Sequence, residues 1–361
     1  MSLLVLSAED VAGLTNAVPA AAFCKMLGKT MSAVSGAMEK PDSVAPIQNP
    51  LRITTESELH KTLYMPSRLT TSDGPATAIK VVGVPKPHCK IPGLPATTLL
   101  FDEATGLTRA VVNAAELTGI RTAAASALST KILADPASAS LVVFGSGTQS
   151  YYHARLVLQL FPAITSATFI VRSLTSRSRA LVERVRGEFD RVQVDAVTAE
   201  RTAEVVKKAD IVCTCVPSTE PLFAEEDLKE NVHITAIGSY QPHMFEFPPS
   251  LIAPPSASSP SSASSPKIPT ILVDSLAACL SESGELIASG IRASNIVEIG
   301  ALLDEEGEVK EDEETKVLLG RLRERGRSLF KCVGVGGMDV AITRLVVEEA
   351  EKRGVGVRVP F

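Results

Sequence analysis

Apolar runs alternate with amphipathic stretches through the middle of the chain, from about residue 140 to 300. The run 140–144 is typical of a buried strand, and 149–161 has apolar residues at helical spacing. The same alternation continues with helical patterns at 175–188 and 199–208 and strand patterns at 192–194, 211–216, 233–237 and 270–273. Parallel strands need crossover helices, so this pattern predicts an α/β fold with a doubly wound parallel sheet.

The two ends of the chain show a different pattern. Residues 1–128 contain short β-like runs separated by turn signals, at 52–54, 78–82 and 97–101. Residues 334–352 predict an amphipathic helix that is entered through a glycine-rich loop, and we expect it to pack on the first domain. We therefore predict a parallel-sheet α/β domain, 129–321, inserted in a mixed α+β domain made of 1–128 plus 322–361.

A serine- and proline-rich segment at 248–268 interrupts the central pattern. Such a composition buries too little apolar surface to offset the entropy lost on ordering. We expect a mobile surface insertion there.

Composition narrows the class of protein. With 361 residues and 45% hydrophobic residues, the chain is long enough for two domains with separate cores. A net charge of −5 and the lack of a basic stripe argue against nucleic-acid binding. The sequence shows neither a bilayer-length apolar run nor a basic leader, so we expect a cytoplasmic protein without a membrane partner. The six cysteines and five histidines show no zinc-site spacing, and we expect no metal.

A glycine turn follows the first central strand. Gly145 and Gly147 lead into Thr148 and Gln149 at the expected helix start. Such a turn lets backbone N–H groups and a helix N-terminus approach a pyrophosphate, so we assign these four residues to cofactor binding. The third glycine of the usual fingerprint is replaced by Ser150. A tight strand–helix turn without a ligand has the same local pattern.

The end of the next strand carries arginines where an NAD-binding domain has an acid. An Asp or Glu there would hydrogen-bond the ribose 2′-hydroxyl, whereas Arg172, Ser173 and Arg177 suit a 2′-phosphate. Surface arginines are also common between a strand and a helix. The pattern favours NADPH, with NADH as the alternative.

Longer motifs resemble a known family. The runs 91–106 and 116–128, the second ahead of the glycine turn, are similar to the ornithine cyclodeaminase/mu-crystallin family. The similarity continues in short motifs at 235–238, 273–275, 296–300 and 329–334. The resemblance implies a Rossmann domain and a substrate domain through which subunits form a homodimer.

The resemblance also assigns roles to individual residues. Arg121 and Arg52 match the family arginines that bind the substrate carboxylate, to which a guanidinium offers two parallel donors. Lys80 matches the lysine beside the amino-bearing carbon, and Thr122, at the start of a helix after Arg121, matches a residue near the cofactor phosphates. From the pattern alone, Arg121 could instead form a surface ion pair and Lys80 could face solvent.

Two positions depart from the cyclodeaminases of this family. The aspartate that handles the distal amine of ornithine is replaced by Tyr240, and the acid before the Met-Pro pair by Leu63. A neutral phenol is a poor base for an ammonium group. The first hypothesis is therefore an NAD(P)H-dependent reductase that converts a cyclic ketimine carboxylate into a cyclic amino acid. The alternatives are an ornithine cyclodeaminase that forms proline and ammonia, an amino-acid dehydrogenase, and a catalytically silent NADP- or ligand-binding protein.

Overall fold

The computed structural model describes residues 2–36, 45–50, 52–86, 88–89, 93–254 and 267–361. The chain forms two compact units. The terminal unit comprises residues 1–121, 303–308 and 335–361, and the central unit comprises 122–302 and 309–334. Most of the expected insertion at 248–268 lies outside the described residues, because 255–266 are not among them.

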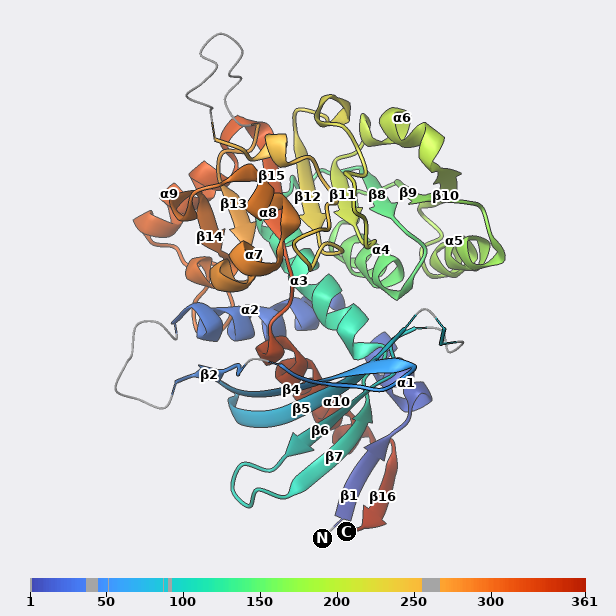
Figure 1. Cartoon of the computed structure of the whole chain (residues 1–361), viewed down its shortest axis with the longest axis vertical. Coiled ribbons are helices and arrows are strands. Elements are labelled where there is room, and N and C mark those ends of the chain that lie inside the picture. Colours follow the sequence, from blue (N-terminus) through green and yellow to red (C-terminus); the bar gives the residue numbers. More distant parts are fainter. Residues whose placement is uncertain (1, 37–44, 51, 87, 90–92, 255–266) are drawn as a thin grey trace. The chain divides into compact units, whose positions relative to one another are not determined.

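The central unit is built on an eight-stranded parallel sheet in the order β10-β9-β8-β11-β12-β15-β13-β14 (Figure 1). Its strands are β8 (Ser140–Phe144), β9 (Ser166–Val171), β10 (Gln193–Thr198), β11 (Ile211–Thr214), β12 (Val232–Ala236), β13 (Ile271–Val273), β14 (Ile296–Glu298) and β15 (Arg327–Lys331). The chain runs outward from β8 to β10 on one side and continues through β11 and β12 on the other. The order therefore reverses between β8 and β11, which confirms the doubly wound sheet and places its switch point beside the glycine turn.

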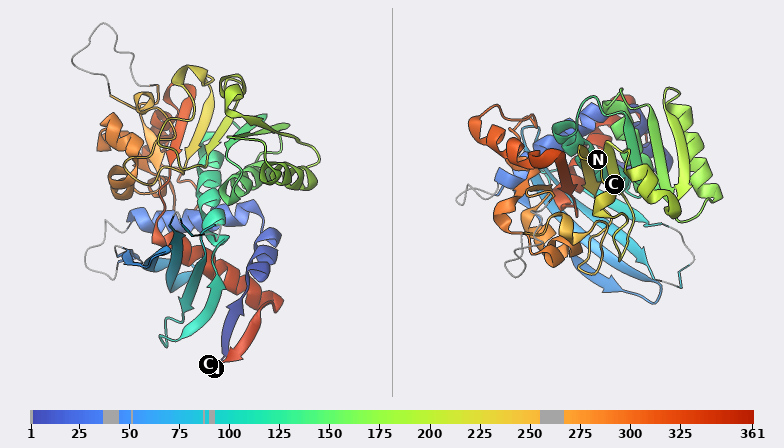
Figure 2. Two further views of the ribbon diagram at one scale, coloured as in Figure 1. Left: turned by 45° about the vertical axis from the view of Figure 1, so that its right-hand side comes forward. Right: turned by 90° about the horizontal axis from the view of Figure 1, so that it is seen from above.

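Helices accompany this sheet, and β11 and β12 are buried at every position. The helices are α3 (Leu117–Leu133), α4 (Thr148–Leu160), α5 (Ser176–Glu188), α6 (Thr202–Val206), α7 (Leu276–Glu282), α8 (Gly284–Ser289) and α9 (Glu313–Leu322). Within the unit, α4 packs on β8 and α5 on β10 (Figure 2). Burial on both faces explains why these strands read as continuous apolar runs.

The terminal unit contains a mixed sheet in the order β16-β1-β7-β6-β5-β4-β2, with β3 paired to β4. Its elements are β1 (Ser2–Leu6), α1 (Ala8–Ala17), α2 (Ala20–Gly36), β2 (Ile47–Gln48), β3 (Ile53–Glu56), β4 (His60–Thr71), β5 (Gly74–Pro85), β6 (Ala96–Phe101), β7 (Thr108–Asn113), α10 (Gly336–Arg353) and β16 (Val357–Pro360). The long helix α10 packs on β4, β5 and α2 (Figure 1). The expectation that the last helix returns to the first domain is confirmed.

Some elements differ from the sequence-based expectation. The segment 199–208 is a short 3-10 helix followed by α6, and α3 begins at Leu117, so Arg121 and Thr122 lie inside a helix. Strands β2, β4, β7, β14, β15 and β16 were not expected. Most residues of β4 are only partly buried, so its apolar positions do not stand out from its polar ones.

Among the described residues, no single helix has the length and apolar character needed to cross a bilayer. Helices α1 and α2 reach that length and apolar composition only when taken together, and the pair is bent.

Candidate active site

The turn after β8 requires a glycine at its first position. Gly145 has φ +107°, a conformation that other residues rarely adopt. A Cβ there would lie 2.6 Å from Cγ1 of Val216 and 2.7 Å from Oγ of Ser150. The Gly145 N–H donates to the carbonyl of Ile170 at 2.8 Å, which ties the turn to β9. The backbone therefore fixes the path from β8 into α4.

The start of α4 is a cradle of backbone N–H groups. Gly147 is its N-cap and makes no side-chain capping bond. Thr148 and Gln149 are the first residues of the helix. The first amides of a helix have no carbonyl partner within the helix and carry the positive end of its dipole. This arrangement fits the pyrophosphate of a dinucleotide.

The structure places the predicted arginines around this turn. Arg177 donates from Nε to the carbonyl of Ser146 at 3.0 Å, and a Cβ on Gly147 would come within 3.3 Å of its Nη2. Arg172 and Ser173 are exposed and directly follow β9, the neighbour of β8. The cations therefore share one sheet edge with the glycine turn.

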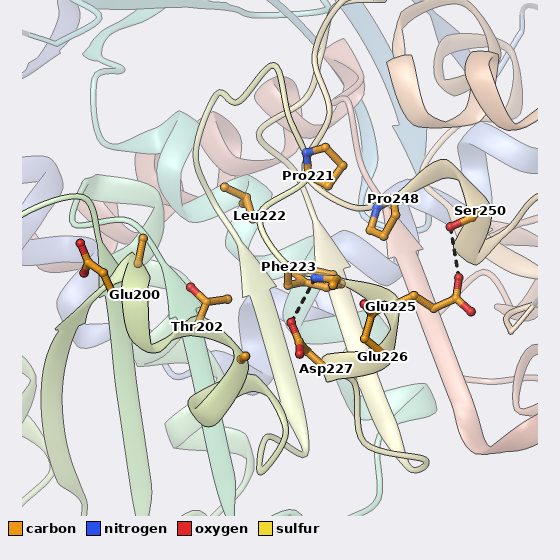
Figure 3. Close-up of a pocket in the computed structure, with 13 residues that line it drawn as sticks. Glu200, Thr202, Pro221, Leu222, Phe223, Glu225, Glu226, Asp227, Pro248 and Ser250 are labelled. Atoms are coloured by element: carbon orange, nitrogen blue, oxygen red, sulfur yellow. Dashed lines mark hydrogen bonds between the residues drawn. The ribbon is translucent and has the colours of Figure 1, made fainter.

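A pocket of about 780 Å³ elsewhere in the central unit does not involve this turn (Figure 3). It lies between α6 and the segments after β11 and β12, and its lining includes Glu200, Glu225, Glu226 and Asp227. Four acids oppose a phosphate group electrostatically. The glycine turn, and not this pocket, is therefore the candidate cofactor site.

A second group of candidate site residues lies within the terminal unit. Lys80 occupies the buried face of β5 and is 3% exposed, which rules out the solvent-facing alternative. Its Nζ lies 2.7 Å from Oδ2 of Asp339 and 3.5 Å from the hydroxyl of Thr118. Arg121 is 7% exposed, and its Nε lies 3.3 Å from Oδ1 of the same aspartate. One carboxylate therefore sits between a lysine and an arginine.

The Asp339 contacts are ion pairs by distance, although neither carboxylate oxygen has a hydrogen bond of good angle. Burial lowers the pKa of Lys80, and the charges of Arg121 and Arg52 lower it further, whereas Asp339 raises it. Lys80 and Arg121 carry more positive charge than Asp339 neutralises, so the cluster suits an anionic substrate group.

The remaining predicted residues have separate places. Arg52 is exposed and precedes β3, yet its charge acts on Lys80. Thr122 is buried in α3. Tyr240 is 43% exposed and follows β12 by a few residues.

The sequence reasoning missed Asp339. It lies in the first turn of α10, where an acid is ordinarily explained by the helix dipole. The only sequence signal was its place directly after the glycine-rich entry to that helix.

A doubly wound parallel sheet with a glycine turn at its switch point defines a Rossmann-type dinucleotide-binding protein. In this chain it is joined to a mixed domain with a buried lysine–arginine pair. Residues 14–255 match the model of the ornithine cyclodeaminase/mu-crystallin family. The chain belongs to that family.

Relatives in sequence and in fold agree with this assignment. A Delta(1)-pyrroline-2-carboxylate reductase of Bacillus cereus is 28% identical over 99% of this chain and 100% of the relative. The ketimine reductase mu-crystallin of Mus musculus is 28% identical over 71% of this chain and 75% of its own length. The fold matches Thermococcus litoralis Delta(1)-pyrroline-2-carboxylate reductase in complex with NADH and L-proline, with TM-score 0.78, 24% identity and coverage of 99% and 100% of the two chains.

Proposed function

We propose that this protein reduces a cyclic ketimine carboxylate to a cyclic amino acid with a nicotinamide cofactor, preferably NADPH. The buried cluster of Lys80, Arg121 and Asp339 is the observation that carries the proposal. It combines an excess of positive charge with a lysine whose pKa is lowered by burial. The names of the sequence relatives support the reaction class.

The chain's own residues divide the work. Arg121 and Arg52 bind the substrate carboxylate, and Lys80 faces the imine nitrogen. A lowered pKa makes protonated Lys80 a stronger acid, so it gives its proton to that nitrogen more readily than an ordinary lysine. When bound, the reduced nicotinamide supplies a hydride to the imine carbon and is itself oxidised. The C=N bond thereby becomes CH–NH.

The cofactor preference rests on residues that follow the carboxyl ends of β8 and β9. Gly145, Gly147, Thr148 and Gln149 would hold the pyrophosphate, and Thr122 would lie near the phosphates. The exposed group of Arg172, Ser173 and Arg177 would bind the 2′-phosphate of NADPH.

The two functional domains follow from these roles. We assign substrate binding and homodimer formation to residues 1–128 plus 322–361 and cofactor binding to 129–321. The compact units divide slightly differently, because their boundary falls inside α3 at Arg121.

The fold of an archaeal alanine dehydrogenase dimer with bound NAD resembles this chain, with TM-score 0.75 and 22% identity over 100% of both chains.

The test follows NADPH and NADH oxidation with pyrroline- and piperideine-2-carboxylate, and proline and ammonia formation from ornithine. Lys80→Met should abolish reduction and leave NADPH binding intact. The control is Lys61→Met, on the neighbouring strand β4, where the lysine is exposed. Unchanged reduction by Lys80→Met would remove this lysine from the mechanism. Ornithine conversion without net cofactor consumption would favour a cyclodeaminase, and NADPH binding without any turnover would favour a binding protein.

A further inference from the structure

Three fully buried charged side chains meet near the carboxyl ends of strands in the central unit. Glu246, Glu285 and Lys331 are each 0% exposed. Lys331 ends β15, and its Nζ lies 3.7 Å from Oε2 of Glu246 and 3.9 Å from Oε2 of Glu285. Buried ion pairs add little net stability, because desolvation offsets their attraction. Net stability therefore does not explain why these three charges are buried together, and we looked for a role in positioning the neighbouring backbone.

Glu246 ties two strand ends together. Its Oε1 accepts the N–H of Val216, just beyond β11, at 3.2 Å. Its Oε2 accepts the N–H groups of Gly238 and Ser239, just beyond β12, at 2.5 and 3.1 Å. A Cβ on Gly238 would lie 2.2 Å from the carbonyl oxygen of Val216, so the two backbones touch here. One carboxylate thus fixes the path of both strands where they leave the sheet.

Ser239 is the joint at which the three charged groups meet. Its hydroxyl accepts from Nζ of Lys331 at 2.5 Å and donates to Glu285 at 2.6 Å. Glu285 also accepts the N–H of Glu246 at 2.7 Å and the hydroxyl of Ser283 at 2.8 Å. A buried network with this many mutual bonds holds one backbone arrangement.

The cluster reaches the cofactor turn through Val216. The Val216 side chain stands so close to Gly145 that any Cβ there would meet its Cγ1 at 2.6 Å. Strand β11, which Val216 follows, pairs directly with β8, which leads into the turn. The position of Val216, set by Glu246, therefore decides how much room the glycine turn has.

We propose that Glu246, Glu285 and Lys331 are positioning residues for the dinucleotide, and that they act when Glu246 is ionised. Protonation of Glu246 would place a hydrogen on one of the two oxygens that accept these three N–H groups, and it would remove the charge that strengthens the bonds. This proposal rests on the proposed function, since it assigns the cluster a role at the same cofactor turn.

The charges around Glu246 set the pH range of this effect. Burial and the charge of Glu285 raise the pKa of Glu246 to about 7, although Lys331 and the backbone N–H groups of Gly238 and Ser239 act to lower it. The neighbouring thiol of Cys215 stays neutral because burial raises its pKa. His243, exposed and three residues before Glu246 in the chain, is the other nearby group that requires a control.

The test is NADH binding to the full chain, followed by fluorescence, because NADH lacks a 2′-phosphate that titrates in the same range. If only the ionised form binds, the affinity at about pH 6 is about tenfold weaker than at about pH 8. Glu246→Gln should weaken NADH binding by about tenfold or more at about pH 8, because it loses charge-assisted hydrogen bonds, and should remove the pH dependence. The exposed Glu226→Gln makes the same charge change and should match the wild type, and His243→Gln should retain the pH dependence.

The outcomes separate this inference from the proposed function. A wild type with constant NADH affinity across that pH range, or a Glu246→Gln variant that binds as the wild type does, would overturn the positioning role. A purely structural role would lower the melting temperature of the variant without changing the pH profile of binding. If Glu246→Gln does not fold, the wild-type profile decides. A wild type that binds neither NADH nor NADPH would refute the proposed function itself.

Discussion

Replacing Asp339 by asparagine tests how the buried cluster controls Lys80. Asp339 raises the pKa of Lys80, against burial and the charges of Arg121 and Arg52, which lower it. Breaking a buried ion pair by removing one partner costs about 3–5 kcal/mol, and both partners are nearly inaccessible here, at 3% and 5% exposure. The pKa of Lys80 should therefore fall further, which leaves less of the protonated lysine that the reduction requires.

The kinetic signature of Asp339→Asn is a split between kcat and KM. The kcat for imine reduction at about pH 8 should fall by about 100-fold, the lower end of the range that one positioned proton donor contributes. KM should not rise, because Arg121 no longer shares its charge with a competing carboxylate. Activity that needs protonated Lys80 declines as pH rises through its pKa, so the alkaline limb of the kcat profile should move to lower pH.

The matched control is Asp73→Asn in the same unit. Asp73 also sits between a lysine and an arginine, Lys29 at 2.6 Å and Arg344 at 3.2 Å, but does not contact Lys80. It should change stability and leave the pH profile in place. An Asp339→Asn profile with an unmoved alkaline limb, or a raised KM with unchanged kcat, would refute this reasoning.

Three further predictions concern the central unit. Gly145→Ala should abolish cofactor binding in a titration, because its φ of +107° and the 2.6 Å approach to a neighbouring side chain exclude a Cβ. The control Gly187→Ala in α5 should bind the cofactor normally and gain about 0.5–1 kcal/mol of stability. Arg177→Ala should weaken NADPH binding by about tenfold and spare NADH, and Arg184→Ala on the same helix should change neither; equal losses for both cofactors would contradict a 2′-phosphate contact. Burial lowers the pKa of His153 to about 4, so the folded state favours the neutral imidazole. The stability that this group contributes is therefore complete above its unfolded pKa and is lost as pH falls toward its folded pKa. In urea unfolding, the wild type should lose about 2 kcal/mol more than His153→Gln between about pH 7 and 5; parallel curves would contradict it.

The sequence by itself determined the parts that depend on local backbone chemistry. Gly145 could be recognised because a turn between a buried strand and a helix needs a positive φ, and β8, α4 and α5 appeared with nearly their observed bounds. Periodicity is a property of neighbouring residues, so it survives without knowledge of the fold. The family resemblance added Lys80 and Arg121. From the local pattern alone, Lys80 could have faced solvent and Arg121 could have formed a surface ion pair.

Only the tertiary structure decided which distant charges meet. Asp339 comes from α10 and Lys80 from β5, and nothing near either residue in the sequence indicates the 2.7 Å pair. The same holds for Glu246, Glu285 and Lys331, which come from three separate segments of the chain and meet while wholly buried. A charge is buried only where folding supplies partners from elsewhere in the chain, and that condition leaves no local pattern to read.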